Sequence, residues 1–160
     1  MNAKYVITGL ISFVAGAVLV AIVGISVAPG MMINESESLY SYDDTVEIIQ
    51  TEAEALGWKI PAVHVISNSV ASGGYDVAPV TVIELCKVDL AGQILSDDES
   101  RVVSSMMPCR IAVYETSDGN VIVSRMNTGL ISKLFGGDIE RLMADATSET
   151  EQILGTVLPH

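Results

Sequence analysis

The sequence predicts an α+β domain whose mainly antiparallel sheet carries its helices on one face, preceded by one N-terminal transmembrane helix. Three observations predict this architecture. An uncharged apolar segment, Tyr5–Ala28, opens the chain. After it, short runs rich in β-branched residues alternate with segments whose apolar residues recur every three to four positions. Two of these runs flank Asp118-Gly119, a dipeptide that favours the tight turn of an antiparallel hairpin.

The segment Tyr5–Ala28 is expected to be an uncleaved membrane anchor. About 20 apolar residues span the hydrocarbon core, whereas the apolar region of a cleaved signal peptide is roughly 7–15 residues long. A signal peptide is the alternative, but Pro29 directly follows Ser26-Val27-Ala28, where cleavage would occur. Lys4 is the basic side chain nearest this segment, so the positive-inside rule favours a cytoplasmic N-terminus. We therefore expect a single-pass protein of the cytoplasmic (inner) membrane, with its domain outside the cytoplasm.

Residues 1–30 are assigned to the anchor. The chain after residue 30 is strongly acidic. All 20 acidic residues and seven of the eight basic ones follow Met31, which gives that part a formal charge of −13 (7 − 20). Such a charge repels phosphate groups, and this excludes nucleic acid as a primary partner. A basic protein partner or a cation is compatible with it. Residues 31–154 are expected to form one domain and residues 155–160 a tail, with His160 unstructured.

The first half of the domain is expected to contain strand, helix and strand in that order. Met31–Ser36 predicts a first strand or an extended linker. Asp43-Asp44, with Glu47 three residues later, resembles a capping box that opens a helix, and Gly57 is placed to end it. The β-branched residues of Trp58–Ser67 then predict a second strand.

The second half is expected to contain a strand, a helix, a hairpin and a terminal helix. Val80–Cys86 predicts the strand, and Asp89 is placed to cap the helix after it. The apolar run Ile111–Tyr114 and its partner Val121–Arg125 predict the hairpin. Apolar residues at helical spacing then predict an amphipathic helix over Ile139–Leu154.

The hairpin region resembles a known family. Its sequence reads Met107-Pro108-Cys109-Arg110-Ile111-Ala112-Val113-Tyr114-Glu115, then Asp118-Gly119-Asn120-Val121 and Met126-Asn127. This resembles the closing hairpin of the domain of unknown function 302 family, and the order of the preceding elements is similar. The resemblance covers about residues 31–154. It implies a small α+β domain that self-associates as a homodimer, and it implies no established reaction and no catalytic residue.

Two positions depart from the pattern of that family. Its members usually leave the third strand through a Gly-Asn-Pro-like sequence, where this chain has Cys86-Lys87-Val88. They usually have an aliphatic residue after the proline, where this chain has Cys109. Features particular to this protein are therefore expected at the two cysteines.

The chain has two cysteines, and the strand directions decide whether they meet. If their strands are antiparallel, Cys86 and Cys109 lie at the same end of the sheet and are able to form a disulfide. If a crossover makes the strands parallel, more than about 15 Å separates the cysteines, beyond the reach of about 7 Å between Cα atoms. Their spacing of 23 residues matches neither a CxxC redox motif nor a CxxCH haem-attachment motif.

Five residues are candidates for a metal or redox site: Cys86, Cys109, Met106, Met107 and His64. Thiolates, thioethers and imidazole suit copper(I), and Cys, His and Met also serve as axial ligands of haem. The alternative is that the methionines fill the core and that His64 is a core residue with its hydrogen bonds satisfied.

The sequence contains no nucleophile elbow, no phosphate loop and no HExxH motif, so a hydrolytic enzyme is not expected. It predicts a membrane-anchored, extracytoplasmic binding or interaction module of unknown ligand. The alternative function is a thiol-based redox protein, or a soft-metal or haem-binding protein, that uses Cys86 and Cys109.

Overall fold

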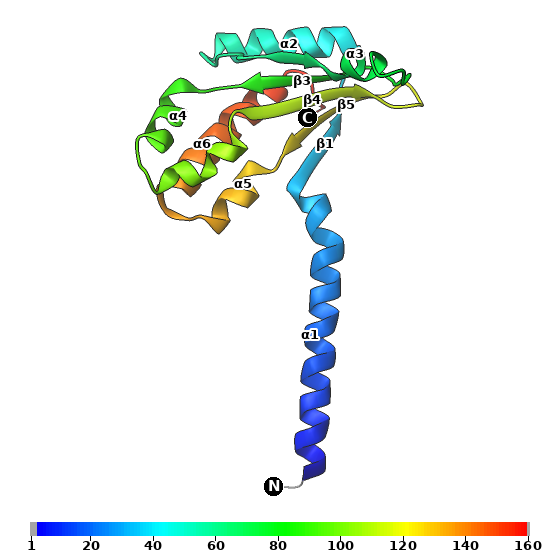
Figure 1. The fold of residues 1–160 in the computed structure, drawn as a ribbon, viewed down its shortest axis with the longest axis vertical. Coiled ribbons are helices and arrows are strands. Elements are labelled where there is room, and N and C mark those ends of the chain that lie inside the picture. Colours follow the sequence, from blue (N-terminus) through cyan, green and yellow to red (C-terminus); the bar gives the residue numbers. More distant parts are fainter. Residues whose placement is uncertain (1–2, 160) are drawn as a thin grey trace. The chain divides into compact units, whose positions relative to one another are not determined.

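A computed structural model of the chain describes residues 3–159, and His160 lies outside the described residues. The chain divides into two compact units, one ending at Met32 and one beginning at Ile33. The first unit is a single helix, α1 (Ala3–Met32), drawn in blue in Figure 1. Its stretch Ile7–Ala28 is long and apolar enough to cross a membrane.

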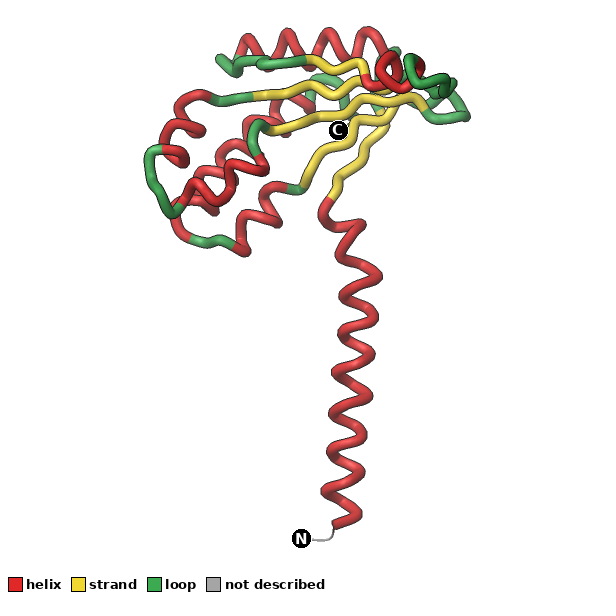
Figure 2. The backbone as a smooth tube through the Cα atoms, in the orientation of Figure 1, coloured by secondary structure: helices red, strands yellow, loops and turns green. Residues whose placement is uncertain are grey.

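The second unit is built on a five-stranded sheet in which all neighbouring strands are antiparallel, as predicted. The strand order is β1-β5-β4-β3-β2, so β4 is central and β1 and β2 are the edges (Figure 2). The strands are β1 (Ile33–Glu37), β2 (Val63–Val65), β3 (Val80–Leu85), β4 (Cys109–Glu115) and β5 (Val121–Met126).

The predicted hairpin joins β4 and β5. Gly119 has φ +83°, a left-handed conformation that glycine adopts without strain. The amide of Thr116 donates to the carbonyl of Asn120 at 2.9 Å, which closes the turn. The Asp118-Gly119 signal is therefore confirmed.

Two helices, α2 (Tyr42–Ala55) and α6 (Gly137–Leu154), cover one face of the sheet. The strand residues that face them are buried and alternate along each strand with partly exposed residues. This confirms the predicted helices on one face. The main core comprises Ile49, Ala53, Trp58, Ile83, Leu85, Ile111, Val113, Val121, Val123, Ile153, Leu154, Val157 and Leu158.

The ends of α2 correct one prediction and confirm another. The helix is capped by Ser41 and not by Asp43 or Asp44, because Ser41 stands three residues before Asp44 and can exchange hydrogen bonds with it. The Asp44 amide donates to Ser41 Oγ at 3.3 Å, and Ser41 Oγ donates to Asp44 Oδ2 at 2.6 Å. At the other end, Gly57 has φ +77° and ends the helix as predicted.

The strand predicted over Trp58–Ser67 is much shorter in the structure. Only Val63–Val65 pairs as β2, and a short helix, α3 (Ile66–Ala71), follows directly. Pro61 lacks an amide donor, and upstream of it Lys59 makes an isolated bridge with Cys86. The first strand is also displaced from its predicted start, since α1 continues through Met32.

The terminal segment belongs to the fold, which corrects the boundary predicted at residue 154. Val157 and Leu158 are buried in the main core. The amide of Leu39 donates to the carbonyl of Val157 at 2.9 Å and holds the segment beside the end of β1. Apolar residues after the last helix turn therefore complete the core.

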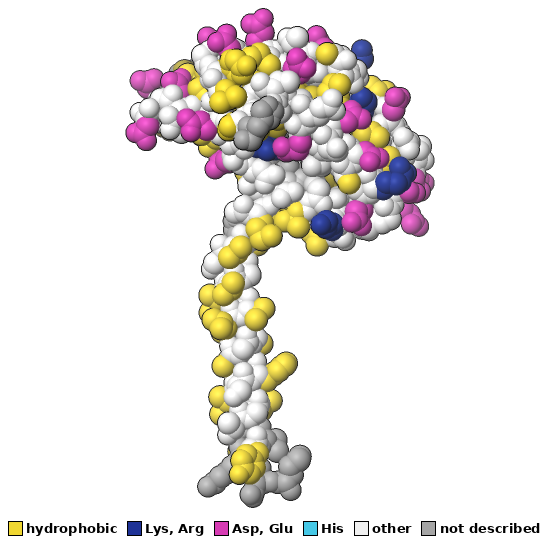
Figure 3. Space-filling view, turned by 180° about the vertical axis from the view of Figure 1, so that it is seen from behind, with side chains coloured by type: hydrophobic (Ala, Val, Ile, Leu, Met, Phe, Trp, Pro, Cys, Tyr) yellow, Lys and Arg dark blue, Asp and Glu magenta, His cyan; other side chains and the backbone are white. Residues whose placement is uncertain are grey.

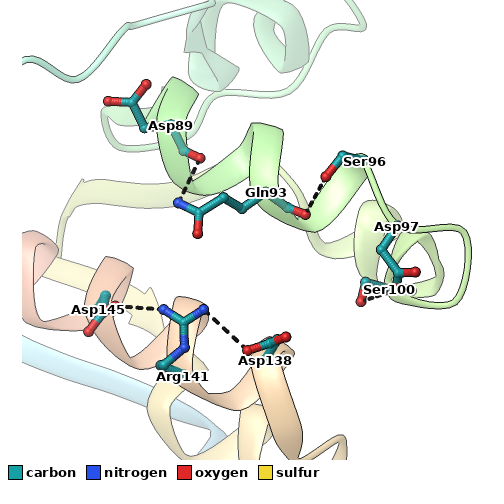
Figure 4. Close-up of polar contacts among 8 residues, drawn as sticks. All are labelled: Asp89, Gln93, Ser96, Asp97, Ser100, Asp138, Arg141 and Asp145. Carbon is teal, nitrogen blue, oxygen red and sulfur yellow. Dashed lines mark hydrogen bonds and ion pairs between the residues drawn. The ribbon is translucent and has the colours of Figure 1, made fainter.

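A helical lobe extends beyond one end of the sheet, where β3 and β5 end and β4 begins. It has its own core of Ile94, Val103, Leu142 and Met143. Its outer surface carries local polar contacts, among them Arg141 with Asp138 at 3.2 Å (Figure 4). The lobe consists of α4 (Val88–Leu95), η1 (Ser100–Met106), α5 (Thr128–Ile131), η2 (Ser132–Leu134) and the N-terminal half of α6.

The surface of the domain is acidic, as its composition requires. Figure 3 shows Asp and Glu side chains distributed over the visible face of the domain, with few Lys or Arg side chains between them. No basic patch large enough to bind a phosphate backbone is visible on this face.

Candidate functional site

The structure places both cysteines at the same end of the sheet. Cys109 begins β4, and its Cα partner on β3 is Leu85, the residue immediately before Cys86. The antiparallel alternative is therefore correct, and the parallel crossover is excluded. Both cysteines are half-buried free thiols.

The two cysteines line an apolar pocket between the main core and the core of the helical lobe. The pocket has a volume of about 50 Å³. On the side of the main core the pocket is lined by Trp58 and Leu85. On the side of the lobe it is lined by Ile94 and Leu142. Five sulfur-bearing side chains line it: Cys86, Met106, Met107, Cys109 and Met143. We call this cavity the sulfur-lined pocket.

Four of the five predicted site residues therefore come together here. Met106 ends η1 and Met107 follows it, so the corner that leads into β4 brings both methionines to the cavity. Met143, on α6, completes the set and was missed by the sequence analysis. Its helical spacing with Leu142 and Ile139 is typical of core packing and gave no signal of a site.

The thiol of Cys109 is held in its neutral form. Burial raises the pKa of this thiol above its ordinary value, and the nearby Cys86 raises it further. Because the thiolate is the nucleophilic form, a raised pKa makes Cys109 a weak nucleophile at neutral pH. The environment of Cys109 is therefore that of a buried ligand or packing residue.

A polar network fixes the indole that forms one wall of the pocket. Trp58 Nε1 donates to Glu149 Oε2 at 2.9 Å. Lys87 Nζ lies 2.7 Å from the same oxygen and donates to the carbonyl of Leu56 at 2.7 Å. Lys87 also lies 5.9 Å from the centre of the Trp58 ring, within reach of a cation–π interaction. In the sequence, Lys87 stands out only as a departure from the family pattern.

A second, more polar pocket of about 90 Å³ shares Met106, Pro108 and Cys109 with the sulfur-lined pocket. Its charged wall is an ion pair: Arg125 Nε and Nη2 donate to the two carboxylate oxygens of Glu151 at 2.8 and 2.7 Å. Arg125 Nη1 also donates to Ser36 Oγ at 3.0 Å, and the Arg125 side chain is only 10% exposed. Cys109 thus lines both the apolar cavity and the pocket that contains this ion pair.

His64 does not lie in the sulfur-lined pocket. It lies on the edge strand β2 opposite Val82, and it is exposed. Its Nε2 is 3.4 Å from Glu84 Oε1, an oxygen that also accepts from Arg110 at 3.1 Å. It is not a buried core residue either, because Val82 belongs to the sheet face opposite the main core. Among residues 3–159, no three His, Cys, Asp or Glu side chains are grouped to hold a metal ion.

Comparison with known families agrees with this fold. The family model described as "Domain of unknown function DUF302" matches residues 34–157. The chain belongs to this family. The resemblance inferred from the hairpin is thereby confirmed.

Among solved structures, the chain is similar to an uncharacterized conserved DUF302 protein from Bacillus stearothermophilus. The identity is 16%, the match covers 78% of this chain and 97% of the other, and the TM-score is 0.69. No curated protein matches the chain. At this identity the DUF302 neighbour shows the fold alone, so a function has to be argued from the side chains of the present chain.

Proposed function

We propose that this DUF302 protein is a membrane-anchored binding module and that the sulfur-lined pocket is its ligand site. The single observation that carries the proposal is the convergence of five sulfur-bearing side chains on one apolar cavity. Apolar cavities with a few specific side chains are the usual form of a small-ligand site. The anchor is supported by the length and composition of Ile7–Ala28. A domain outside the cytoplasm is supported by Lys4 and belongs to the same proposal.

The pocket favours a small, soft ligand, and copper(I) fits best. Thiolates and thioethers are soft donors that select copper(I) over harder cations. A volume of about 50 Å³ is far below the roughly 300 Å³ at which pockets for organic ligands begin, so it favours an ion over haem. The acidic surface raises the local concentration of cations. Because thiols lose protons when they bind a metal, the affinity is expected to rise with pH.

Trp58 supplies the test, since it is the only tryptophan of the chain and lines the pocket. The full chain in detergent is titrated anaerobically with copper(I) from a coloured chelator, while Trp58 fluorescence and chelator absorbance are recorded. We expect stoichiometric transfer of copper with quenching. Cys109→Ser should abolish both effects, and Met32→Leu, a methionine outside the pocket, should change neither. If the chelator keeps all its copper in the wild type, copper(I) is not the ligand.

A thiol redox function is the second candidate, favoured by the position of both cysteines at one end of adjacent antiparallel strands. In this reaction the two thiols lose two protons and two electrons to form a disulfide, and a partner disulfide accepts them to become two thiols. The raised pKa of Cys109 argues against rapid exchange. Counting free thiols after incubation with oxidised glutathione tests it. Full retention of both thiols would eliminate this candidate.

Homodimer formation and binding of a basic protein partner are further parts of the proposal. The first is supported by the family resemblance and the second by the acidic surface shown in Figure 3. Light scattering of the detergent-solubilised chain at several concentrations tests the first. The salt dependence of any captured complex tests the second, because an electrostatic contact weakens as salt rises.

A further inference from the structure

We propose that Leu134 and Phe135, at the tip of the helical lobe, insert into the bilayer surface and form a second membrane contact. The inference rests on the membrane anchoring proposed above. The proposed contact is an interaction surface on the domain itself, and the partner that it binds is zwitterionic lipid.

The tip exposes apolar side chains to an unusual degree. Leu134 is 83% exposed, more than any other large apolar side chain that the structure describes, and Phe135 beside it is exposed as well. Gly136 and Gly137 follow with φ +68° and +56° and turn the chain sharply into α6. The two side chains therefore project from a tight turn, and no described element covers them.

The strand register places this tip at the sheet end where the anchor joins the domain. Ile33, the first residue of β1, is the Cα partner of Met126, the last residue of β5. Because the two strands are antiparallel, β1 leads away from the anchor junction and β5 returns to it. The chain then continues from Met126 through α5 and η2 to Leu134.

The connection between anchor and domain is short. The candidate span ends at Ala28 and β1 begins at Ile33, five residues later. Five residues extend over at most about 18 Å, since an extended chain advances about 3.6 Å per residue. Ile33 therefore stays within about 18 Å of the end of the candidate span, and α5 and η2 follow the strand end that pairs with Ile33.

The chemistry of the tip suits the interface of a neutral bilayer. Lys133 precedes the two apolar residues, and a lysine beside Leu and Phe can bury its stem while its amine stays among the headgroups. Asp138 and Glu140 follow in the first turn of α6, and the domain as a whole is acidic. Anionic lipid is therefore disfavoured, and the contact is expected with phosphatidylcholine-like headgroups.

The test compares two exposed leucines at opposite ends of the sheet. Leu134→Trp places a reporter at the tip, and Leu39→Trp is the matched control, since Leu39 is 62% exposed and lies just beyond the far end of β1. Both full-length variants and the wild type are reconstituted in phosphatidylcholine vesicles with and without brominated acyl chains. We expect brominated lipid to quench the added fluorescence of Leu134→Trp and to leave that of Leu39→Trp unchanged.

Each outcome decides the proposal. An unquenched Leu134→Trp, or equal quenching of both variants, overturns it. Flotation of the vesicles separates the two proposals: a chain that floats with an unquenched tip keeps its anchor and loses the tip contact. A chain that does not float loses both.

Discussion

Leu85 and Cys109 are directly opposed Cα partners on β3 and β4, and this pairing brings Cys86 to the rim of the same cavity as Cys109. The segment between Leu85 and Cys109 contains α4 and η1, and it leaves the sheet and returns to it at one end. A helical excursion between two antiparallel strands thus creates both the pocket and the proximity of the thiols. The following predictions test the interactions around that pocket and at two other places in the domain.

Alkylation of Cys109 should depend on pH more strongly than that of an ordinary thiol. Burial and Cys86 raise the pKa of the Cys109 thiol, so the reactive thiolate becomes abundant only above the ordinary thiol range. Peptide mass spectrometry of iodoacetamide-treated protein between pH 7 and 10 measures the rate. Cys86→Ser should shift the profile toward lower pH, since the second cause of the rise is removed. Rapid labelling at pH 7 would contradict the assigned environment.

Glu149→Ala should destabilise the domain by about 1–3 kcal/mol, because it leaves the buried Trp58 Nε1–H without its acceptor and Lys87 without its carboxylate. Urea unfolding followed by Trp58 fluorescence gives the free energy of unfolding. Asp145→Ala on the same helix is the control: its 4.0 Å pair with Arg141 is exposed and should matter little. Equal losses for the two variants would show that the network does not stabilise the domain.

Glu151→Ala should lower the free energy of unfolding by about 1–3 kcal/mol. It leaves Arg125 without its carboxylate partner, and the Arg125 side chain is only 10% exposed. The loss should stay below the roughly 3–5 kcal/mol of a fully buried pair, since Glu151 is 42% exposed. Arg141→Ala removes an exposed ion pair with Asp138 and serves as the control. Urea unfolding measures the loss of stability in both variants. An unchanged unfolding midpoint for Glu151→Ala would refute the prediction.

Stability should fall above about pH 10 because of Tyr114. Its hydroxyl donates to Glu35 Oε1 at 2.7 Å, and this hydrogen bond is the main cause that raises the pKa of Tyr114. A raised pKa in the folded state means that the stabilisation is complete below the unfolded value, near 10, and is lost as the pH rises through the folded value. Tyr114→Phe should remove this part of the alkaline loss. Thermal unfolding from pH 8 to 11 tests it, and identical profiles for the two proteins would exclude this role of Tyr114.

Local signals in the sequence predicted much of the fold. The Asp118-Gly119 turn, the helix end at Gly57 and the alternating pattern of β3 each depend on residues within a few positions of one another. The errors arose where local signals compete. Ser41 and Asp43 are both good N-caps, and only the position of the first helical turn decides between them. The run Trp58–Ser67 is rich in β-branched residues, yet its pairing with β3 ends at Val65 opposite Thr81, near the start of β3, and Ile66 begins a helix instead.

The candidate site was predicted only in part for a similar reason. Cys86, Cys109, Met106 and Met107 were found because they are unusual residues close to strand ends. Met143 and Glu149 lie on a helix whose pattern is that of an ordinary amphipathic helix, so nothing in it distinguishes a pocket wall from core filling. His64 was grouped with the cysteines by residue type, whereas its pairing with Val82 of β3 places it on the opposite face of the sheet.

The sequence by itself determined the apolar N-terminal segment, the acidic domain, the α+β class and the closing hairpin, since each follows from composition or from contacts between near neighbours. Tertiary structure decided whether the two cysteines meet, which methionines join them, and where the lobe lies relative to the sheet. These depend on strand order and register, which are set by the burial of the whole core. The hydrophobic pattern of single strands leaves strand order open, and the burial of one sheet face against α2 and α6 specifies the register of the strands that border the pocket.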